Sequence, residues 1–157
     1  MEPEFCARVK ATLQEGLSFF EPVDVPGGIP SDSCLFCWRL HTGLTAYLLF
    51  YPINRRGRFK VDAAWSTHGN YPAHLSQMVV RRDEKLNIPA DNPINGEFRF
   101  PVSELWDPSR DRSWRAETSA RGNDLKSVVR EIGSHFVPYM RQLDPNCPGG
   151  WSSVREL

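Results

Sequence analysis

Two cysteines three residues apart are the first feature of this sequence that could do chemistry. Cys34 and Cys37 form a C-x-x-C pair in the stretch CLFCWRLH, and His41 follows four positions later. Such a pair serves redox exchange when its first cysteine begins a helix, and it binds zinc when two further ligands complete the site. The neighbours here favour a strand, in which residues three apart point to opposite faces. We therefore predict that Cys34 packs in the core and that Cys37 lies on the opposite face with Arg39 and His41, without metal or cofactor.

The four cysteines of the sequence do not suggest a disulfide framework. Cys6, Cys34, Cys37 and Cys147 are irregularly spaced, and the first twenty residues mix acidic and basic side chains without the apolar stretch of an export signal. We expect four free thiols in a cytoplasmic protein. Apolar runs stay well short of the roughly 18 residues that cross a bilayer, so we expect no membrane contact.

A second group of polar residues surrounds the turn after a predicted strand. It consists of Asp62, Ser66, His68 and His74. Serine, histidine and aspartate together can hydrolyse esters or amides, but the G-x-S-x-G elbow that exposes a nucleophilic serine is missing here. These four residues define the alternative function, a small-molecule-binding or hydrolytic enzyme with its site at this turn.

Arginines and tryptophans supply the candidate protein-binding surface. The residues are Arg55, Arg56, Arg58, Trp106 and Trp114. Arg and Trp are the residue types that most often anchor protein interfaces. A solvated turn for the arginines, and a position over the edge of the core for the tryptophans, are the competing interpretations. Nineteen basic residues balance nineteen acidic ones, which gives no overall field for nucleic acid.

The elements that position these groups begin with a helix and three strands. Phe5, Val9, Leu13 and Leu17 recur every four residues and predict an N-terminal helix with one buried stripe. The alternation of apolar residues then predicts strands over residues 34–41, 44–51 and 58–66, joined by short loops into an antiparallel meander. The middle strand is apolar on both faces and should be central, and the third should have one buried and one solvated face.

The second half of the sequence predicts fewer strands and a long helix. Residues 97–102 alternate, but Pro101 restricts them to an edge strand or a strand end. Residues 73–82 fit a helix or a strand, and a short strand over 112–117 is left open. From an N-cap at Asn123, apolar residues trace a helical stripe to Leu143, which Pro138 should bend or interrupt.

Together these elements predict an α+β fold. An antiparallel sheet of about four to six strands is flanked by an N-terminal and a C-terminal helix in two layers. The chain has 157 residues, of which 40% are hydrophobic and 24% charged, as expected for a globular protein. We expect residues 1–157 to form a single domain in which 144–157 is a loosely packed tail.

The stretch FKVDAAWSTHGNYP resembles a sequence type found in small bacterial proteins of uncharacterised families. The similarity covers roughly residues 5–72 and rests on Phe59, Val61, Trp65, Ser66 and Pro72. Several such α+β proteins look like immunity proteins of toxin systems. The resemblance implies a non-catalytic domain that binds a protein partner, an enzyme or toxin, and inhibits it by steric occlusion.

Overall fold

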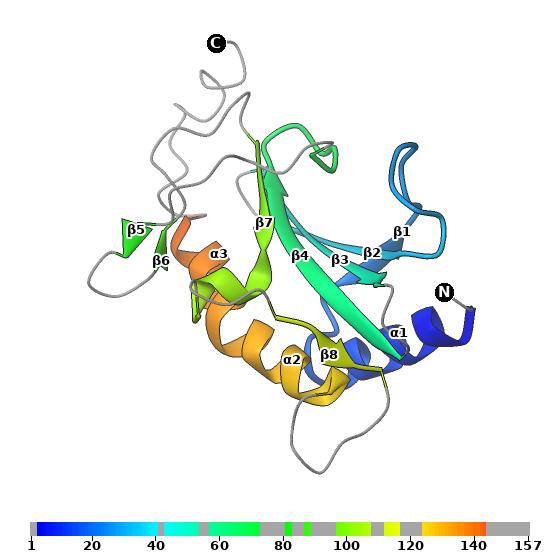
Figure 1. The fold of residues 1–157 in the computed structure, drawn as a ribbon. Coiled ribbons are helices and arrows are strands. Elements are labelled where there is room, and N and C mark those ends of the chain that lie inside the picture. The colour runs from blue at the N-terminus through cyan, green and yellow to red at the C-terminus, as the bar shows by residue number, and fades with distance from the viewer. Residues whose placement is uncertain are drawn as a thin grey trace.

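The chain folds around a six-stranded antiparallel sheet with helices on one face (Figure 1). This computed structural model describes residues 3–40, 43–53, 57–72, 81–82, 87–88, 97–107, 112–116 and 124–143. The helices are α1 (Pro3–Gly16), α2 (Leu125–Glu131), the π-helix η2 (Ile132–Phe136), α3 (Val137–Leu143) and the short 3₁₀ helix η1 (Val102–Leu105). The strands are β1 (Glu21–Val23), β2 (Cys34–Arg39), β3 (Thr45–Pro52), β4 (Arg58–Ser66), β5 (Arg81–Arg82), β6 (Asn87–Ile88), β7 (Glu97–Pro101) and β8 (Trp114–Arg115). The predicted α+β class is confirmed.

The predicted meander forms the middle of the sheet. The strand order is β1-β2-β3-β4-β7, and all neighbours are antiparallel. The turns on either side of β3 contain Gly43 and Gly57 with φ of 85° and 70°, a left-handed conformation that glycine adopts without steric cost. The doubly apolar strand is central, as predicted, because β3 lies between β2 and β4.

The later strands complete the sheet. β7 pairs with the last five residues of β4, at the end of the strand order, so the edge position predicted from Pro101 is confirmed. The short strand considered for residues 112–117 exists as β8, which pairs with the beginning of β4 at Arg58 and Phe59. β5 and β6 form a separate two-stranded sheet, which makes residues 81–82 a strand, while 73–80 lie outside the described residues.

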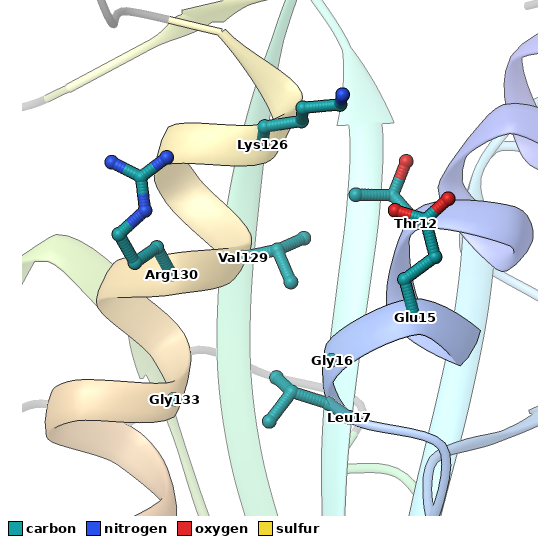
Figure 2. Close-up of a pocket in the computed structure, with 8 residues that line it drawn as sticks. All are labelled: Thr12, Glu15, Gly16, Leu17, Lys126, Val129, Arg130 and Gly133. Carbon is teal, nitrogen blue, oxygen red and sulfur yellow. The ribbon is translucent and has the colours of Figure 1, made fainter.

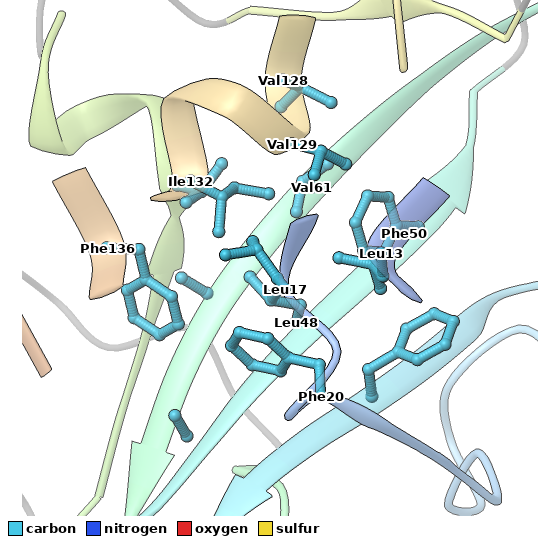
Figure 3. Close-up of a cluster of buried hydrophobic side chains, with 14 of the residues drawn as sticks. Leu13, Leu17, Phe20, Leu48, Phe50, Val61, Val128, Val129, Ile132 and Phe136 are labelled. Carbon is cyan, nitrogen blue, oxygen red and sulfur yellow. The ribbon is translucent and has the colours of Figure 1, made fainter. Parts of the chain in front are cut away.

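The main core lies between one face of the sheet and the helices (Figure 3). The stripe predicted for the N-terminal helix is buried along its whole length. It meets residues from β3 and β4, such as Phe50 and Val61, and from the C-terminal helix, such as Ile132 and Phe136. Both helices therefore cover the same face of the sheet, which gives the two predicted layers.

The opposite face of the sheet is less exposed to solvent than the alternating pattern of residues 58–66 predicts. Of the five expected solvated positions of β4, Arg58 and Lys60 are partly exposed, whereas Asp62, Ala64 and Ser66 are at most 2% exposed. A second apolar cluster on this face includes Cys37, and partly buried residues such as Tyr71 pack against it. Residues beyond the strands cover this face, and a period of two within one strand carries no information about such a cover.

The C-terminal helix begins one residue later than predicted. Asp124 is the N-cap, and its side chain accepts the backbone N–H of Ser127 at 3.0 Å, while the Ser127 hydroxyl accepts the Asp124 N–H at 3.0 Å. This reciprocal capping box satisfies two donors of the first turn. The predicted cap, Asn123, lies outside the described residues.

Pro138 does not interrupt the helix, which continues to Leu143. Helical backbone runs through α2, η2 and α3, and the Val137 N–H bonds to the Ile132 carbonyl five residues earlier. A proline ring collides with the preceding turn of an ordinary α-helix. The wider π turn directly before Pro138 provides space for the ring. The helix therefore changes locally from α to π before Pro138 and does not end there.

Candidate functional site

The predicted protein-binding residues are largely occupied inside the molecule. The Arg58 guanidinium donates to the Ser113 hydroxyl at 2.8 Å and to the Ser113 carbonyl at 2.9 Å, which fixes the β8 segment against β4. Trp114 is 3% exposed, and its ring lies 6.2 Å from that of Phe59. Trp114, a candidate anchor for a protein partner, is therefore a core residue of a strand and does not present its ring on the surface.

Trp106 covers the edge of the core beside the C-terminal helix. It is partly buried, stacks on His135 with 5.2 Å between ring centroids, and lies 6.4 Å from Trp114. Its indole N–H is buried and has no hydrogen-bond partner among the described residues. Trp106 therefore fits the competing interpretation, in which the tryptophan covers the edge of the core. Arg55 and Arg56 lie outside the described residues.

The alternative polar site divides into two separate groups, of which the first surrounds Asp62. The Arg99 guanidinium of β7 donates from Nε and from one terminal nitrogen to Asp62 Oδ2, both at 3.2 Å. The Tyr51 hydroxyl is 3.4 Å from the other carboxylate oxygen. Burial raises the pKa of Asp62 above its usual 3.8, although Arg99 and Tyr51 act in the opposite direction. This carboxylate is paired and enclosed rather than presented to a substrate.

Tyr71 closes this group from outside the sheet. The Arg99 guanidinium lies over the Tyr71 ring at 5.1 Å from its centroid, and Tyr47 meets the same ring edge-on at 5.5 Å. Burial also raises the pKa of the Tyr71 hydroxyl, which has no hydrogen-bond partner among the described residues. The second face of the sheet thus holds one buried ion pair under an aromatic cover.

The second polar group joins Ser66, His68 and Glu97 in a chain. Ser66 Oγ is 3.2 Å from His68 Nδ1, and His68 Nε2 is 3.2 Å from a Glu97 carboxylate oxygen. The sequence placed Ser66 and His68 together correctly but missed Glu97, which comes from β7, a neighbouring strand. His74 lies outside the described residues.

This serine–histidine–glutamate chain lacks the access that hydrolysis requires. Ser66 is 0% exposed, and its oxygen also accepts the backbone N–H of His68 at 3.1 Å. A nucleophilic serine must reach a substrate carbonyl while its base holds it in position. Here the hydroxyl instead stabilises the turn that follows β4, so the arrangement is better suited to structure than to catalysis.

The cysteines differ from the sequence expectation. Cys6 of α1 and Cys34 of β2 form a disulfide that spans 28 residues of sequence, so the expectation of free thiols is wrong for both. Irregular spacing could not reveal a pairing that depends on how α1 packs against β2. Cys37 is a free, buried thiol on the opposite face from Cys34, as predicted, but its neighbours there are apolar. Cys147 lies outside the described residues.

Two concave surfaces could not be predicted from the sequence. The first is a groove of about 330 Å³ between α1 and the C-terminal helix (Figure 2). It is lined by Thr12, Glu15, Gly16, Leu17, Lys126, Val129, Arg130 and Gly133. The second is a pocket of about 270 Å³ beside the disulfide. The spacing of Lys126, Val129, Arg130 and Gly133 places them on one helix side, but their opposite wall comes from a distant helix.

Neither a metal centre nor a membrane helix is found in the described part of the chain. Its histidines, cysteines and acidic residues form no group of three or more that could hold a metal ion. The helices there are too short or too polar to cross a bilayer.

The fold and the site define an α+β protein in which Asp62, Ser66 and His68 are held by neighbouring side chains and in which two concave surfaces lie beside α1. Comparisons of the chain with protein-family models, with curated proteins and with solved structures each gave no match.

Proposed function

We propose that this chain is a non-catalytic protein-binding domain and that the groove between α1 and α2 receives the partner. The observation that carries the proposal is the composition of this groove. Its floor is formed by the apolar side chains of Leu17 and Val129, and charged side chains stand on both walls (Figure 2). A protein segment with one apolar side chain between polar neighbours matches this arrangement.

The charges of the groove favour an acidic partner. Lys126 and Arg130 stand one turn apart on α2, with the Lys126 side chain directed toward α1 and the Arg130 side chain at the outer rim, whereas Glu15 is the single charged residue that α1 contributes to the lining (Figure 2). A partner helix with leucine over the floor and glutamates facing α2 would complement two cations without leaving a buried charge unpaired. The partner is therefore expected to present an acidic, amphipathic segment.

Two glycines keep the groove open. Gly16 and Gly133 face each other across it, one from each wall (Figure 2). A Cβ at Gly133 would meet Leu17 Cδ2 at 3.5 Å, an ordinary contact, so alanine fits there and a larger side chain would fill the groove. This difference provides a matched pair of variants.

A synthetic acidic amphipathic helix, with leucines on one face and glutamates beside them, tests the groove directly. We expect it to bind, and a peptide with lysines in place of the glutamates to bind at least about tenfold more weakly, since two charge contacts change sign. Gly133→Leu should abolish binding and Gly133→Ala should retain it. Equal binding of both peptides, or binding unaffected by Gly133→Leu, would contradict the proposal.

The resemblance to immunity proteins narrows the proposed partner to an enzyme or toxin of the same cytoplasm. Steric occlusion would then be the mechanism, with the groove holding a segment near the active site of the partner. A toxin-like reading frame beside the gene would support this assignment, and a neighbouring metabolic operon would oppose it. In co-expression with such a toxin, the wild-type chain should protect cells and the Lys126→Glu, Arg130→Glu double variant should not.

The competing enzyme function rests on one observation, the chain from Ser66 through His68 to Glu97. If it were catalytic, Ser66→Ala would abolish hydrolysis of simple ester substrates without changing the fold. We expect instead no esterase activity above that of Ser66→Ala, because the serine oxygen is enclosed.

A further inference from the structure

A pocket opens beside the disulfide, on the other side of α1 from the groove. It holds about 270 Å³ and lies between α1, β1 and the start of β2. Its lining comprises Cys6, Ala7, Lys10, Pro22, Val23, Val25, Ser33, Cys34, Leu35 and Phe36. Both cysteines of the disulfide are therefore part of its wall, and a molecule in the pocket would touch the bond that ties α1 to β2.

The two cysteines of the disulfide differ in exposure. Cys34 is 4% exposed, at the first position of β2, whereas Cys6 is only partly buried on α1. Exchange begins when a thiolate approaches one sulfur of a disulfide, and the more accessible sulfur is attacked. Cys6 Sγ is accordingly the electrophile, and Cys34 is the leaving group.

Ser33 gives the pocket an unused polar contact. The residue is 4% exposed, and its hydroxyl is buried without a hydrogen-bond partner among the described residues. Such a group costs free energy unless something binds to it. Ser33 lines the pocket beside Cys34, and a rotation of its side chain about χ1 would bring the enclosed hydroxyl to a polar atom of a bound molecule.

Lys10 gives the pocket its charge. It stands one helical turn after Cys6, which places both on the same side of α1, and it is the charged residue among those that line the pocket. A nearby ammonium attracts an anion and favours the thiolate form of an incoming thiol. The rest of the lining is largely apolar and accepts the carbon skeleton of a small molecule.

We infer that this pocket binds a small anionic thiol, such as a glutathione-like peptide, and that the bound thiol exchanges with Cys6–Cys34. The incoming thiolate attacks Cys6 Sγ, a new S–S bond forms between them, and the Cys6–Cys34 bond breaks. Its electron pair leaves on Cys34 as a thiolate, which then takes a proton from solvent. The product is a mixed disulfide on Cys6 and a free Cys34, with no net change in oxidation.

The pocket shares no lining residue with the groove between α1 and α2, so the two proposals rest on separate parts of the surface. Small thiols attack accessible disulfides by exchange, so a disulfide that lines an open pocket is exposed to this reaction wherever such thiols are present. If such a thiol enters the pocket, the protein alternates between a disulfide form and a thiol-modified form in which α1 is no longer tied to β2. The position of α1, which also forms one wall of the groove, would then depend on the thiol pool.

The test uses the oxidised full-length protein and reduced glutathione, with 2-mercaptoethanol as a neutral thiol of similar reactivity. Intact mass after acid quenching measures the adduct, and peptide mapping identifies the modified cysteine. We expect one glutathione on Cys6, formed several-fold more slowly in Lys10→Glu. Arg39→Glu, the same charge change on an exposed residue at the far end of β2, should not slow it. Lys10→Glu should slow the reaction with 2-mercaptoethanol less than that with glutathione, because only glutathione carries carboxylates besides its thiolate.

Ser33→Ala separates binding from folding. Removal of a buried hydroxyl without a partner should leave the free energy of unfolding unchanged or raised, yet the adduct should form more slowly. An adduct on Cys34, no adduct, equal slowing by Lys10→Glu and Arg39→Glu, or an unchanged rate in Ser33→Ala would each overturn the inference.

Discussion

The indole N–H of Trp65 donates to the hydroxyl of Tyr139 at 2.9 Å, which joins the central part of the sheet to the C-terminal helix. Trp65 is 2% and Tyr139 is 3% exposed, so the bond lies in the core. It connects residues 74 positions apart in sequence. The long helix is thus held on the sheet by a directional polar contact as well as by apolar packing.

Tyr139→Phe should destabilise the protein although it keeps the aromatic ring. The substitution removes the acceptor of a buried indole, which costs about 1–3 kcal/mol in the free energy of unfolding. Urea denaturation followed by tryptophan fluorescence measures the loss. Phe136→Leu, a nearby change without a hydrogen bond, serves as a packing control, and a Tyr139→Phe variant as stable as wild type would show that this hydrogen bond contributes nothing.

Alkaline pH should unfold the protein through its buried tyrosines. Burial raises the pKa of Tyr47 from its usual 10 to about 12 and raises those of Tyr71 and Tyr139 as well. Since the folded state holds these protons more tightly than the unfolded state, their stabilisation is complete below pH 10 and is lost as the pH rises above it. Each tyrosine contributes a slope of up to about 1.4 kcal/mol per pH unit.

Absorbance of tyrosinate and circular dichroism, recorded together from pH 9 upward, check this prediction. The ionisation of the buried tyrosines should coincide with unfolding, and Tyr47→Phe should make the loss of stability less steep. Ionisation of these side chains well before the circular dichroism changes would show that the cover over the second face opens without unfolding.

How much of the fold the sequence predicts depends on which signals are local. The stripe of α1 and the alternation of β2 to β4 are written in short repeating patterns, and they led to the correct sheet. The Arg99 partner of Asp62 and the Glu97 partner of His68 are not, because both come from β7, which is distant in sequence from β4 and the turn after it. The sequence therefore predicted the apolar layer well and the second face poorly.

The candidate site shows the same limit more strongly. The residue type of Trp114 suggests a protein interface, whereas its burial depends on the pairing of β8 with β4. The disulfide likewise depends on the packing of α1 against β2. Grooves are relationships between elements, so neither wall of the α1–α2 groove could be recognised from its own helix.

Arg99→Met should destabilise the protein at neutral pH and much less in acid. Without the guanidinium, the Asp62 carboxylate loses its cationic partner inside the protein, which costs about 3 kcal/mol or more. Its pKa, already raised by burial, rises further. The folded state then binds a proton more readily than the unfolded state, so the stability of the variant relative to wild type improves as the pH falls toward 4.

Urea denaturation of the wild type and of Arg99→Met gives the difference in the free energy of unfolding at pH 7.5 and at pH 4.5. The Asp62→Asn, Arg99→Met double variant is the control, because it removes both charges and should recover part of the stability at pH 7.5. A loss of the same size at both pH values would mean that Arg99 acts through packing alone.

Cys37 should be costly to replace by serine and slow to react, because it lies in the apolar cluster on the second face of the sheet. Its thiol is 4% exposed among Leu35, Tyr47, Leu49 and Ala64, so a hydroxyl there would be desolvated at a cost of about 1–3 kcal/mol. Burial also raises the pKa of the thiol, which keeps it protonated and unreactive at neutral pH. In a Cys147→Ser background, Ellman's reagent should modify Cys37 slowly in buffer and rapidly in urea. Cys37→Ala, which introduces no polar atom, should be more stable than Cys37→Ser, and the reverse order would place the thiol against polar groups rather than in an apolar cluster.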